Sequence, residues 1–586
     1  MGSPGTEPFQ GWERVRFLFP GLTKRQPWAG VSERLRRCCT LKDALLACPH
    51  LCQNYLETPS LACPDLMTAT GAICYFIPPF ESRVLSMSTE TDSGDDYVSI
   101  EFLHAAERIA ENLHGDAKAD VVSIIAGRYA KLALIDKALQ LAESISDPFT
   151  RDNMLSEIAA ASIATGTSDY VEASLELIDD PGSRSLAIEE IAVKHAEAGD
   201  LDQALELADE LEDAEPALRR IALAEGSYSP GAVELASSIT APDLRASTLG
   251  QLAALAYQSD HKSEAAELLE ECLQAAEEIE FSENRIYTLI GVASLYEDMG
   301  DTDKALEILD QAFALTADFE GMPASGLSAS FPRGEVLTQL VESFARLGHF
   351  DQADRAAEQI DDPFQFAHAS TKEAMEYFRA GQVEQAFTLL TEALELALEE
   401  KVYGEQGMLV KDSLLAELAV GFARLGRLEK SLEVAAKLSS QSQQFLALGL
   451  VGKECARTCN SPGMFRAAEA ITNNHSLASY WLAVTDVLTD SAQTELARQT
   501  LLKAKESAQT IEAKFERAES VIEVAYRLAR VNDSKASALF TLALDTISQL
   551  TDYKKALALL RLDERFTQLN RKLNEDERML LKQVLS

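Results

Sequence analysis

The chain has 586 residues and is strongly acidic: 53 Lys and Arg stand against 94 Asp and Glu, a formal net charge of −41. Nucleic-acid-binding proteins need Lys and Arg to displace phosphate counterions, so this charge argues against nucleic acids as ligands. The same repulsion applies to anionic membrane surfaces. Hydrophobic residues make up 46% of the chain, which favours a large buried core over wholesale disorder.

The first part of the chain differs in composition from the rest. Residues 1–86 hold six of the nine cysteines and carry a charge of +2, whereas residues 87–586 carry −43. The stretch M-S-T-E-T-D that begins at Met87 is typical of a soluble N-terminus. We therefore expect residues 1–86 to be a disordered or mis-annotated N-terminal extension, and residues 87–586 to be the folded region.

From Ser99 onward, apolar residues recur at i, i+3, i+4 and i+7 without strand-like alternation, which predicts helices throughout. A phrase of the form D-K-A-L returns at intervals, with a small residue as its anchor. Clear anchors are Ala138, Ala204, Ala305, Ala353 and Ala386, and weaker copies lie around Ala173, Ala232, Ala265, Ser431, Ala467, Ala497 and Ala538. The mean spacing is about 36 residues, enough for two helices and two turns. We predict about twelve degenerate helix–turn–helix units.

Other residue types repeat at fixed distances before these anchors. A small residue stands twelve positions before each anchor. A ring stands three positions after this small residue, and a turn glycine stands seven positions after the same small residue. The small residues are Ala126, Ala192, Ala293 and Ala374; the rings are Tyr129, Tyr296, Tyr377 and Phe422; the glycines are Gly199, Gly300, Gly348, Gly381 and Gly426. Small residues let two helices cross closely, rings fill the gap between units, and glycine ends a helix in the left-handed conformation.

These four offsets together resemble the tetratricopeptide pattern. The resemblance implies an all-α fold, a right-handed α-α superhelix of stacked helix pairs. The sequence departs from the family near the start of the first helix, where Val122, Ile188 or Leu289 replaces tryptophan. Within the solenoid we expect a loop insertion at 320–333 and C-terminal capping helices over about 551–586.

A second phrase, of the form D-P-x-x-R, marks the step from one unit to the next. Asp is a natural N-cap, and Pro is a natural first helical residue. The arginines of this phrase are Arg151, Arg184, Arg219 and Arg245. They either pair with acidic residues of an adjacent unit or line a groove that binds carboxylates. We favour the pairing, because the phrase follows a turn that already has a structural purpose.

Catalytic and cofactor signatures are missing from the sequence. It contains no H-E-x-x-H, Walker-type glycine loop or G-x-S-x-G. The spacing of Cys48, His50, Cys52 and Cys63 fits no paired zinc-knuckle pattern. We therefore predict no catalytic residue, no cofactor and no metal site. With no signal peptide and no apolar run of about 20 residues, we expect a cytoplasmic protein without membrane insertion.

The resemblance implies a non-enzymatic protein–protein interaction scaffold or adaptor that holds a peptide or protein partner on its concave face. The net charge predicts an acidic concave wall and hence a basic or amphipathic partner. Two alternatives stay open: a regulatory or sensor subunit of a larger complex, and an α/α-barrel enzyme in which helix pairs close into a ring. The sequence specifies neither the partner's identity nor the oligomeric state.

Overall fold

The computed structural model describes residues 100–317, 331–399 and 404–585, and within these ranges the chain forms 27 α-helices and no strand. Residues 1–86, with the cysteines considered for zinc, and most of the predicted loop, 320–330, lie outside the described residues. The remaining three residues of that loop belong to a helix that begins at Phe331.

Twenty-four of the helices form twelve consecutive helix–turn–helix hairpins, the number of units that the sequence predicts. They are α6 (Asp116–Lys131) and α7 (Ile135–Glu143), α8 (Pro148–Ala164) and α9 (Tyr170–Glu176), α10 (Pro181–Glu197) and α11 (Leu201–Ala208), α12 (Glu215–Leu223) and α13 (Pro230–Ser238), α14 (Pro242–Gln258) and α15 (Lys262–Glu277), α16 (Ser282–Asp298) and α17 (Thr302–Leu315), α18 (Phe331–Arg346) and α19 (Phe350–Ala357), α20 (Pro363–Arg379) and α21 (Val383–Glu399), α22 (Gly404–Arg424) and α23 (Leu428–Ala435), α24 (Gln441–Arg457) and α25 (Ser461–Glu469), α26 (Asn474–Asp490) and α27 (Thr494–Gln509), α28 (Lys514–Arg530) and α29 (Lys535–Ser548). The other three are α5 (Glu101–Ala110), α30 (Asp552–Gln568) and α31 (Glu575–Val584).

One backbone device ends every first helix. A residue with positive φ follows each even-numbered helix from α6 to α30 and satisfies the last helical carbonyls by turning the chain into the left-handed region. Seven of these residues are glycines, including the five predicted turn glycines. The other six are Ala133, Asp260, Cys459, Ala492, Asn532 and Asn570.

The D-P phrases start first helices in the predicted way. The carboxylates of Asp147, Asp180 and Asp362 accept a hydrogen bond from the backbone N–H three residues on, and the next residue is the proline at the first helical position. An aspartate at this position satisfies one of the orphan N–H groups of the helix, and proline has no N–H to leave unpaired. The hairpins are therefore punctuated at both ends by local sequence.

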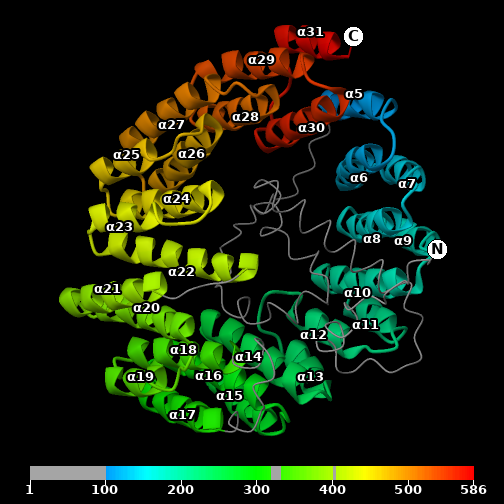
Figure 1. Ribbon diagram of the computed structural model, residues 1–586. Helices are drawn as coiled ribbons and strands as arrows, with labels where there is room; N and C mark the ends of the chain where they lie inside the picture. The colour runs from blue at the N-terminus through cyan, green and yellow to red at the C-terminus, as the bar shows by residue number, and fades with distance from the viewer. Residues whose placement is uncertain (1–99, 318–330, 400–403, 586) are drawn as a thin grey trace, which may run out of the picture. The chain divides into compact units, whose positions relative to one another are not determined.

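The hairpins stack in two layers. First helices of successive hairpins contact one another from α6 through α30, and each second helix packs against its own first helix and the first helix that follows. Consecutive second helices make no comparably extensive contacts within the described ranges. The first helices therefore form the closely packed inner layer of the array, and the second helices form the outer layer (Figure 1).

The predicted anchors fall one on each second helix. Ten of the twelve anchor side chains are buried between the helices of their hairpin. Ala173 and Ala538 are exposed, and the neighbouring Ser174 and Ala536 take the buried places. At these two hairpins the predicted register was wrong, by one residue at Ala173 and by two at Ala538.

The last of the first helices, α30, packs against a helix from the other end of the described chain. After α30, the chain continues into α31, which packs against α29 instead. The place beside α30 is taken by α5 (Figure 1). Phe102 of α5 meets Phe566 of α30 edge to face, with ring centroids 5.0 Å apart, and both rings are buried. The series of helix contacts therefore returns to its start, with α30 also touching α6.

Candidate binding surface on the layer of first helices

The two layers differ sharply in charge. Within the helix bounds given above, the thirteen first helices contain 26 Lys and Arg against 28 Asp and Glu, a net charge of −2. The twelve second helices contain 10 against 27, a net charge of −17. The acidic charge therefore belongs mainly to the second helices, whose starting phrase is itself acidic, and the first helices carry little of the net charge from which the acidic wall was predicted.

The left-handed residue after each first helix gives the helices a common register. Positions nine and thirteen residues before it are four apart, so they share one helix face. In α24, Leu450 stands nine residues and Leu446 thirteen residues before the left-handed residue. Ile124 of α6 occupies the position nine residues before it, and Leu186 of α10 the position thirteen residues before it. All four side chains are exposed. On the outward face of the first-helix layer, which points away from the second helices, α6, α10 and α24 thus present apolar side chains to solvent, whereas other first helices carry polar residues there, such as Glu417 and Glu523.

The predicted repeat positions on the first helices lie inside the layer. Ala126, Ala192, Ala293 and Ala374 are buried, as are the rings of Tyr129, Tyr296 and Phe422, whereas Tyr377 is half-buried. The Tyr129 hydroxyl donates to Oε2 of Glu107 on α5 at 2.6 Å, and Tyr377 stacks on Phe350 with ring centroids 3.8 Å apart. These side chains pack between helices and take no part in the exposed face.

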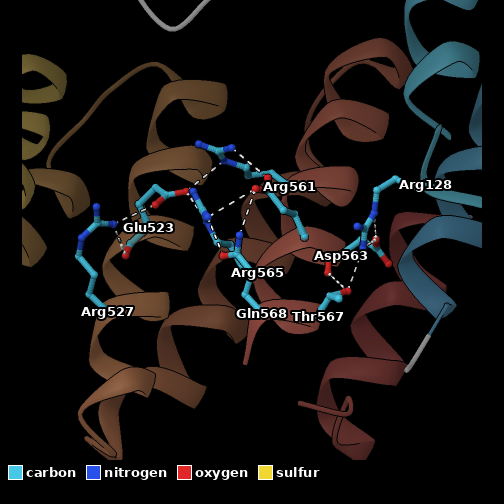
Figure 2. A network of polar contacts seen from close by, with 9 residues as sticks. Arg128, Glu523, Arg527, Arg561, Asp563, Arg565, Thr567 and Gln568 are labelled. Carbon is cyan, nitrogen blue, oxygen red and sulfur yellow. Dashed lines mark hydrogen bonds and ion pairs between the residues drawn. The ribbon is translucent and has the colours of Figure 1, made fainter. Parts of the chain in front are cut away.

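A network of charged side chains joins α26, α28 and α30 on this layer (Figure 2). Nε and Nη2 of Arg527 donate to Oδ1 and Oδ2 of Asp486 at 2.9 and 2.8 Å, and its Nη1 donates to Oε2 of Glu523 at 2.9 Å. Oε1 of Glu523 lies 3.0 Å from Nε of Arg561 and 2.9 Å from Nε of Arg565. Burial alone would raise the pKa of Glu523, but the three arginines hold it below its usual value.

The network continues across the junction between the last and first repeats. Arg128 of α6 donates from Nε and Nη2 to Oδ2 of Asp563 at 2.9 and 2.7 Å, and from Nη2 to the Thr567 hydroxyl at 2.9 Å (Figure 2). The Asp563 side chain is only 2% exposed. Burial raises the pKa of Asp563, and the neighbouring Arg128 opposes that rise. This ion pair lies within the contact between α30 and α6.

A second polar cluster spans α16 to α22. Nε2 of His368 lies 3.1 Å from Oε2 of Glu417, and Nζ of Lys372 lies 3.6 Å from the same oxygen. Burial would raise the pKa of Glu417, but His368 and Lys372 lower it below its usual value. Burial and the Glu283 charge raise the pKa of Glu335, on the helix before. The cluster therefore combines opposite charges between α20 and α22 with the like charges of Glu283 and Glu335 between α16 and α18.

Two arginines of the D-P-x-x-R phrase, Arg184 and Arg245, reach back to the end of the preceding hairpin. Nη1 of Arg184 donates to the Leu175 carbonyl at 2.9 Å, and Nη1 of Arg245 donates to the Ile239 carbonyl at 3.1 Å. Arg151 and Arg245 also bind acidic residues at the end of the following second helix, Asp179 and Glu278, both at 2.6 Å. Nε of Arg219 is buried without a hydrogen-bond partner among the described residues.

The sequence search missed further members of this set. Arg517 donates to the Ile511 carbonyl at 3.5 Å, and Nε2 of Gln444 donates to the Leu438 carbonyl at 3.1 Å. Each of these side chains lies four residues after the helix N-cap and six residues after its carbonyl partner, as Arg245 does. Their phrases lack the D-P pair. A search for a long donor side chain six residues after a buried Ile or Leu would have found them.

Three general features bear on function. In the described parts of the chain, no group of three or more His, Cys, Asp or Glu side chains is placed to hold a metal ion. Burial raises the pKa of the Cys272 thiol to about 12 and that of Cys455 to about 11, so both are protonated at neutral pH. Among the described helices, none has the length and hydropathy needed to cross a bilayer.

No protein-family model matches the chain, and no curated protein matches it either. Several solved helical-repeat structures are similar to it at low identity. Rap protein in complex with competence and sporulation factor is 13% identical, with 72% of this chain and 98% of that chain covered and a TM-score of 0.24. A signal transduction ATPase with a tetratricopeptide repeat sensor, from Pyrococcus horikoshii, is 13% identical, with 83% and 68% covered and a TM-score of 0.23.

The human IFIT1 dimer with PPP-AAAA is also 13% identical, with 78% of this chain and 99% of that chain covered and a TM-score of 0.27. The architecture of the chain itself is clear from its own helices. Paired helices, a left-handed turn after each first helix and buried small residues at the crossings recur from α6 onward. The described residues form a tetratricopeptide-like helical repeat array.

Proposed function

We propose that this protein is a non-enzymatic protein–protein interaction scaffold that binds its partner on the outward face of the first-helix layer. The observation that carries the proposal is the division of charge between the layers. A surface with nearly balanced charge and exposed apolar side chains such as Leu186 and Leu450 suits burial against another protein. The second helices, with their excess of Asp and Glu, keep the opposite face solvated.

The partner is an amphipathic protein segment in this proposal. The first helices hold no excess of Lys and Arg, so they offer no counterion-releasing surface for a nucleic acid. A preference for a purely basic partner loses support, because the acidic residues lie mainly on the second helices. Apolar burial supplies the affinity, and local charges set the orientation.

Arg151, Arg184, Arg219 and Arg245 have a structural role in this proposal. The backbone carbonyls that Arg184 and Arg245 contact belong to the preceding hairpins. The acidic residues Asp179 and Glu278, which Arg151 and Arg245 contact, lie where their own hairpins lead into the next. Arg245 donates to carbonyls and a carboxylate, and Arg151 donates to two carboxylates, so fewer of their donors are free for a ligand. These contacts support the arrangement in which the arginines tie one hairpin to the next.

The second candidate function is a regulatory or sensor subunit of a larger complex, which would bind its partner in the same way. The α/α-barrel enzyme shares one feature with this chain, the contact of α30 with α5 and α6 at the start of the array. The polar side chains of the Glu523 and Glu417 clusters are engaged with one another, and the buried thiols of Cys272 and Cys455 stay protonated. These observations favour binding over catalysis.

The experiment compares two triple variants of the full chain in capture of partners from native extract. Ile124→Asp, Leu186→Asp and Leu450→Asp together change the first-helix face, whereas Leu134→Asp, Leu201→Asp and Leu398→Asp change side chains of similar exposure at the second helices. We expect the first variant to lose the partners that the wild-type chain retains, and the second to keep them. Loss by the second variant alone would place binding on the outer layer and reject the proposal.

A further inference from the structure

Two leucines project from α24 between smaller or polar neighbours. Leu446 and Leu450 are 52% and 48% exposed. At the same two positions of α26, counted back from Ala492, stand Ser479 and Ala483. On the other side, α22 has Ser413 and Glu417 at these positions, counted back from Gly426. The leucines therefore form an apolar ridge that the adjacent first helices do not cover.

The ridge is open to solvent along its length. A Cβ added to Gly449, which lies between the leucines, would meet no heavy atom within 4 Å. Leu446, Gly449, Leu450 and Lys453 follow the i, i+3, i+4, i+7 spacing of one helix face. A glycine with open space above it allows another helix to approach the backbone closely.

Positive charge is concentrated at the C-terminal end of the ridge. Oε2 of Glu454 lies 3.3 Å from Nε of Arg424 and 3.3 Å from Nη1 of Arg457, so a single carboxylate serves two guanidinium groups. Lys453 adds a third cation on the exposed face, one turn beyond Leu450. Three cations therefore lie near Glu454, while the acidic residues of the adjacent helices at these levels, Glu417 of α22 and Asp486 of α26, are paired with other cations.

We propose that the face of α24 formed by Leu446, Gly449 and Leu450 docks an amphipathic helix of a partner protein whose apolar stripe ends in acidic residues. The inference rests on the proposed scaffold function and specifies the site and the partner's chemistry. The leucines bury apolar side chains of the partner, as in helix-in-groove recognition. Arg424, Lys453 and Arg457 form ion pairs with the acidic residues at the end of the bound helix, and these pairs fix its direction.

The test uses two fluorescein-labelled synthetic helices of about 18 residues, long enough to be partly helical in water. Both carry the same i, i+3, i+4, i+7 leucine stripe; one has glutamates in its last turn and the other has lysines. Fluorescence anisotropy with the full chain should show tighter binding of the glutamate probe. The double variant Leu446→Asp, Leu450→Asp should weaken that binding about tenfold or more, since two half-exposed leucines no longer contribute apolar burial.

The matched control is Leu201→Asp, a change on second helix α11 at a leucine that is 39% exposed and lies outside the first-helix layer, and it should leave glutamate-probe binding unchanged. Lys453→Ala with Arg457→Ala should remove the preference for the glutamate probe over the lysine probe. Circular dichroism checks that each variant is folded, and Leu446→Ser, Leu450→Ser replaces the aspartate variant if that one unfolds.

Equal glutamate-probe binding by wild-type chain and the double variant overturns the proposal, as does stronger binding of the lysine probe at this face. Sedimentation of the wild-type chain that shows a dimer, abolished by the double variant, would assign the ridge to a second copy and also overturn it. If the double variant still retains its partners from native extract while the first-helix triple variant does not, the scaffold function stands and only this location fails.

Discussion

Replacing Arg128 with alanine tests the contact that joins the last repeat to the first. The change leaves the Asp563 carboxylate, 2% exposed, without its cation and without a replacement donor of similar strength. Removing one partner of a buried ion pair costs about 3–5 kcal/mol, and the Arg128 side chain is itself 20% exposed, so we expect a value near the lower end. Hydrogen exchange should accelerate about 100-fold in α5, α6 and α30, with little change in repeats far from them.

The loss of folding stability caused by Arg128→Ala should change with pH in one direction. Burial raises the pKa of Asp563, and removal of Arg128 raises it further. A carboxyl whose folded pKa exceeds its unfolded value binds its proton more tightly in the folded state, so acid favours folding. The deficit of the Arg128→Ala variant relative to the wild-type chain should therefore be full at pH 8 and shrink as the pH falls through the folded pKa of Asp563.

Arg220→Ala is the matched control. Arg220 also pairs with two acidic residues, Glu189 and Glu190, but its side chain is 40% exposed, so its loss should cost about 1 kcal/mol or less. Exchange rates in α5, α6 and α30 should not change in this variant. Equal protection of these three helices in the Arg128→Ala variant and the wild-type chain would show that the ion pair does not hold the junction, and would refute the reasoning.

Three further outcomes are expected. Arg245→Ala should lower the free energy of unfolding by about 1–2 kcal/mol, because the Ile239 carbonyl and Glu278 lose their donor, yet partner capture should persist; lost capture at unchanged stability would make the arginines a ligand groove. Burial and the Asp354 charge raise the pKa of Glu373 to about 7, so its ionisation destabilises the folded chain as the pH rises from about 4.5 to 7. Glu373→Gln should therefore stabilise the chain by up to about 3 kcal/mol at pH 8 and by little at pH 5 in urea unfolding, whereas an effect independent of pH would contradict the assignment. Gly452→Ala should cost about 2 kcal/mol or more, because the added Cβ would meet the buried Tyr480 ring; Gly449→Ala on the same helix faces open space and should be neutral or slightly stabilising, and equal melting temperatures would count against the packing of α24 on α26.

The sequence predicted the unit count well because each turn has a local chemical cause. Gly199, Gly300 and Gly426 mark first-helix ends through a conformation that glycine adopts without strain. Six other ends use non-glycine residues such as Cys459 and Ala492, which no residue-type search would choose. At those six ends the prediction rested on the hydrophobic period and the anchor spacing. Across the whole array, the predicted register was wrong at two anchors.

The pairing of α5 with α30 was not predictable from local pattern. Periodicity shows that both segments are helices with one apolar face, but it does not say which helix covers which face. Arg128 and Asp563 illustrate the difficulty, because each sits in an ordinary helical phrase and is joined to the other only by the closure of the contacts. The charge division between layers, by contrast, was available from the sequence once helix bounds were drawn, since the acidic D-K-A-L phrases all open second helices.

The contact between α5 and α30 also sets a condition on synthesis. About 440 residues separate the end of α5 from the start of α30, and ribosomes add roughly 5–20 residues per second. The face of α5 that carries Phe102 therefore waits roughly 20–90 seconds for the helix that covers it. During that interval the growing chain holds a helix with an unburied apolar face next to an array that is otherwise folding repeat by repeat. A nascent chain of this kind is a natural client for ribosome-associated chaperones, and its demand for them should end when α30 leaves the exit tunnel.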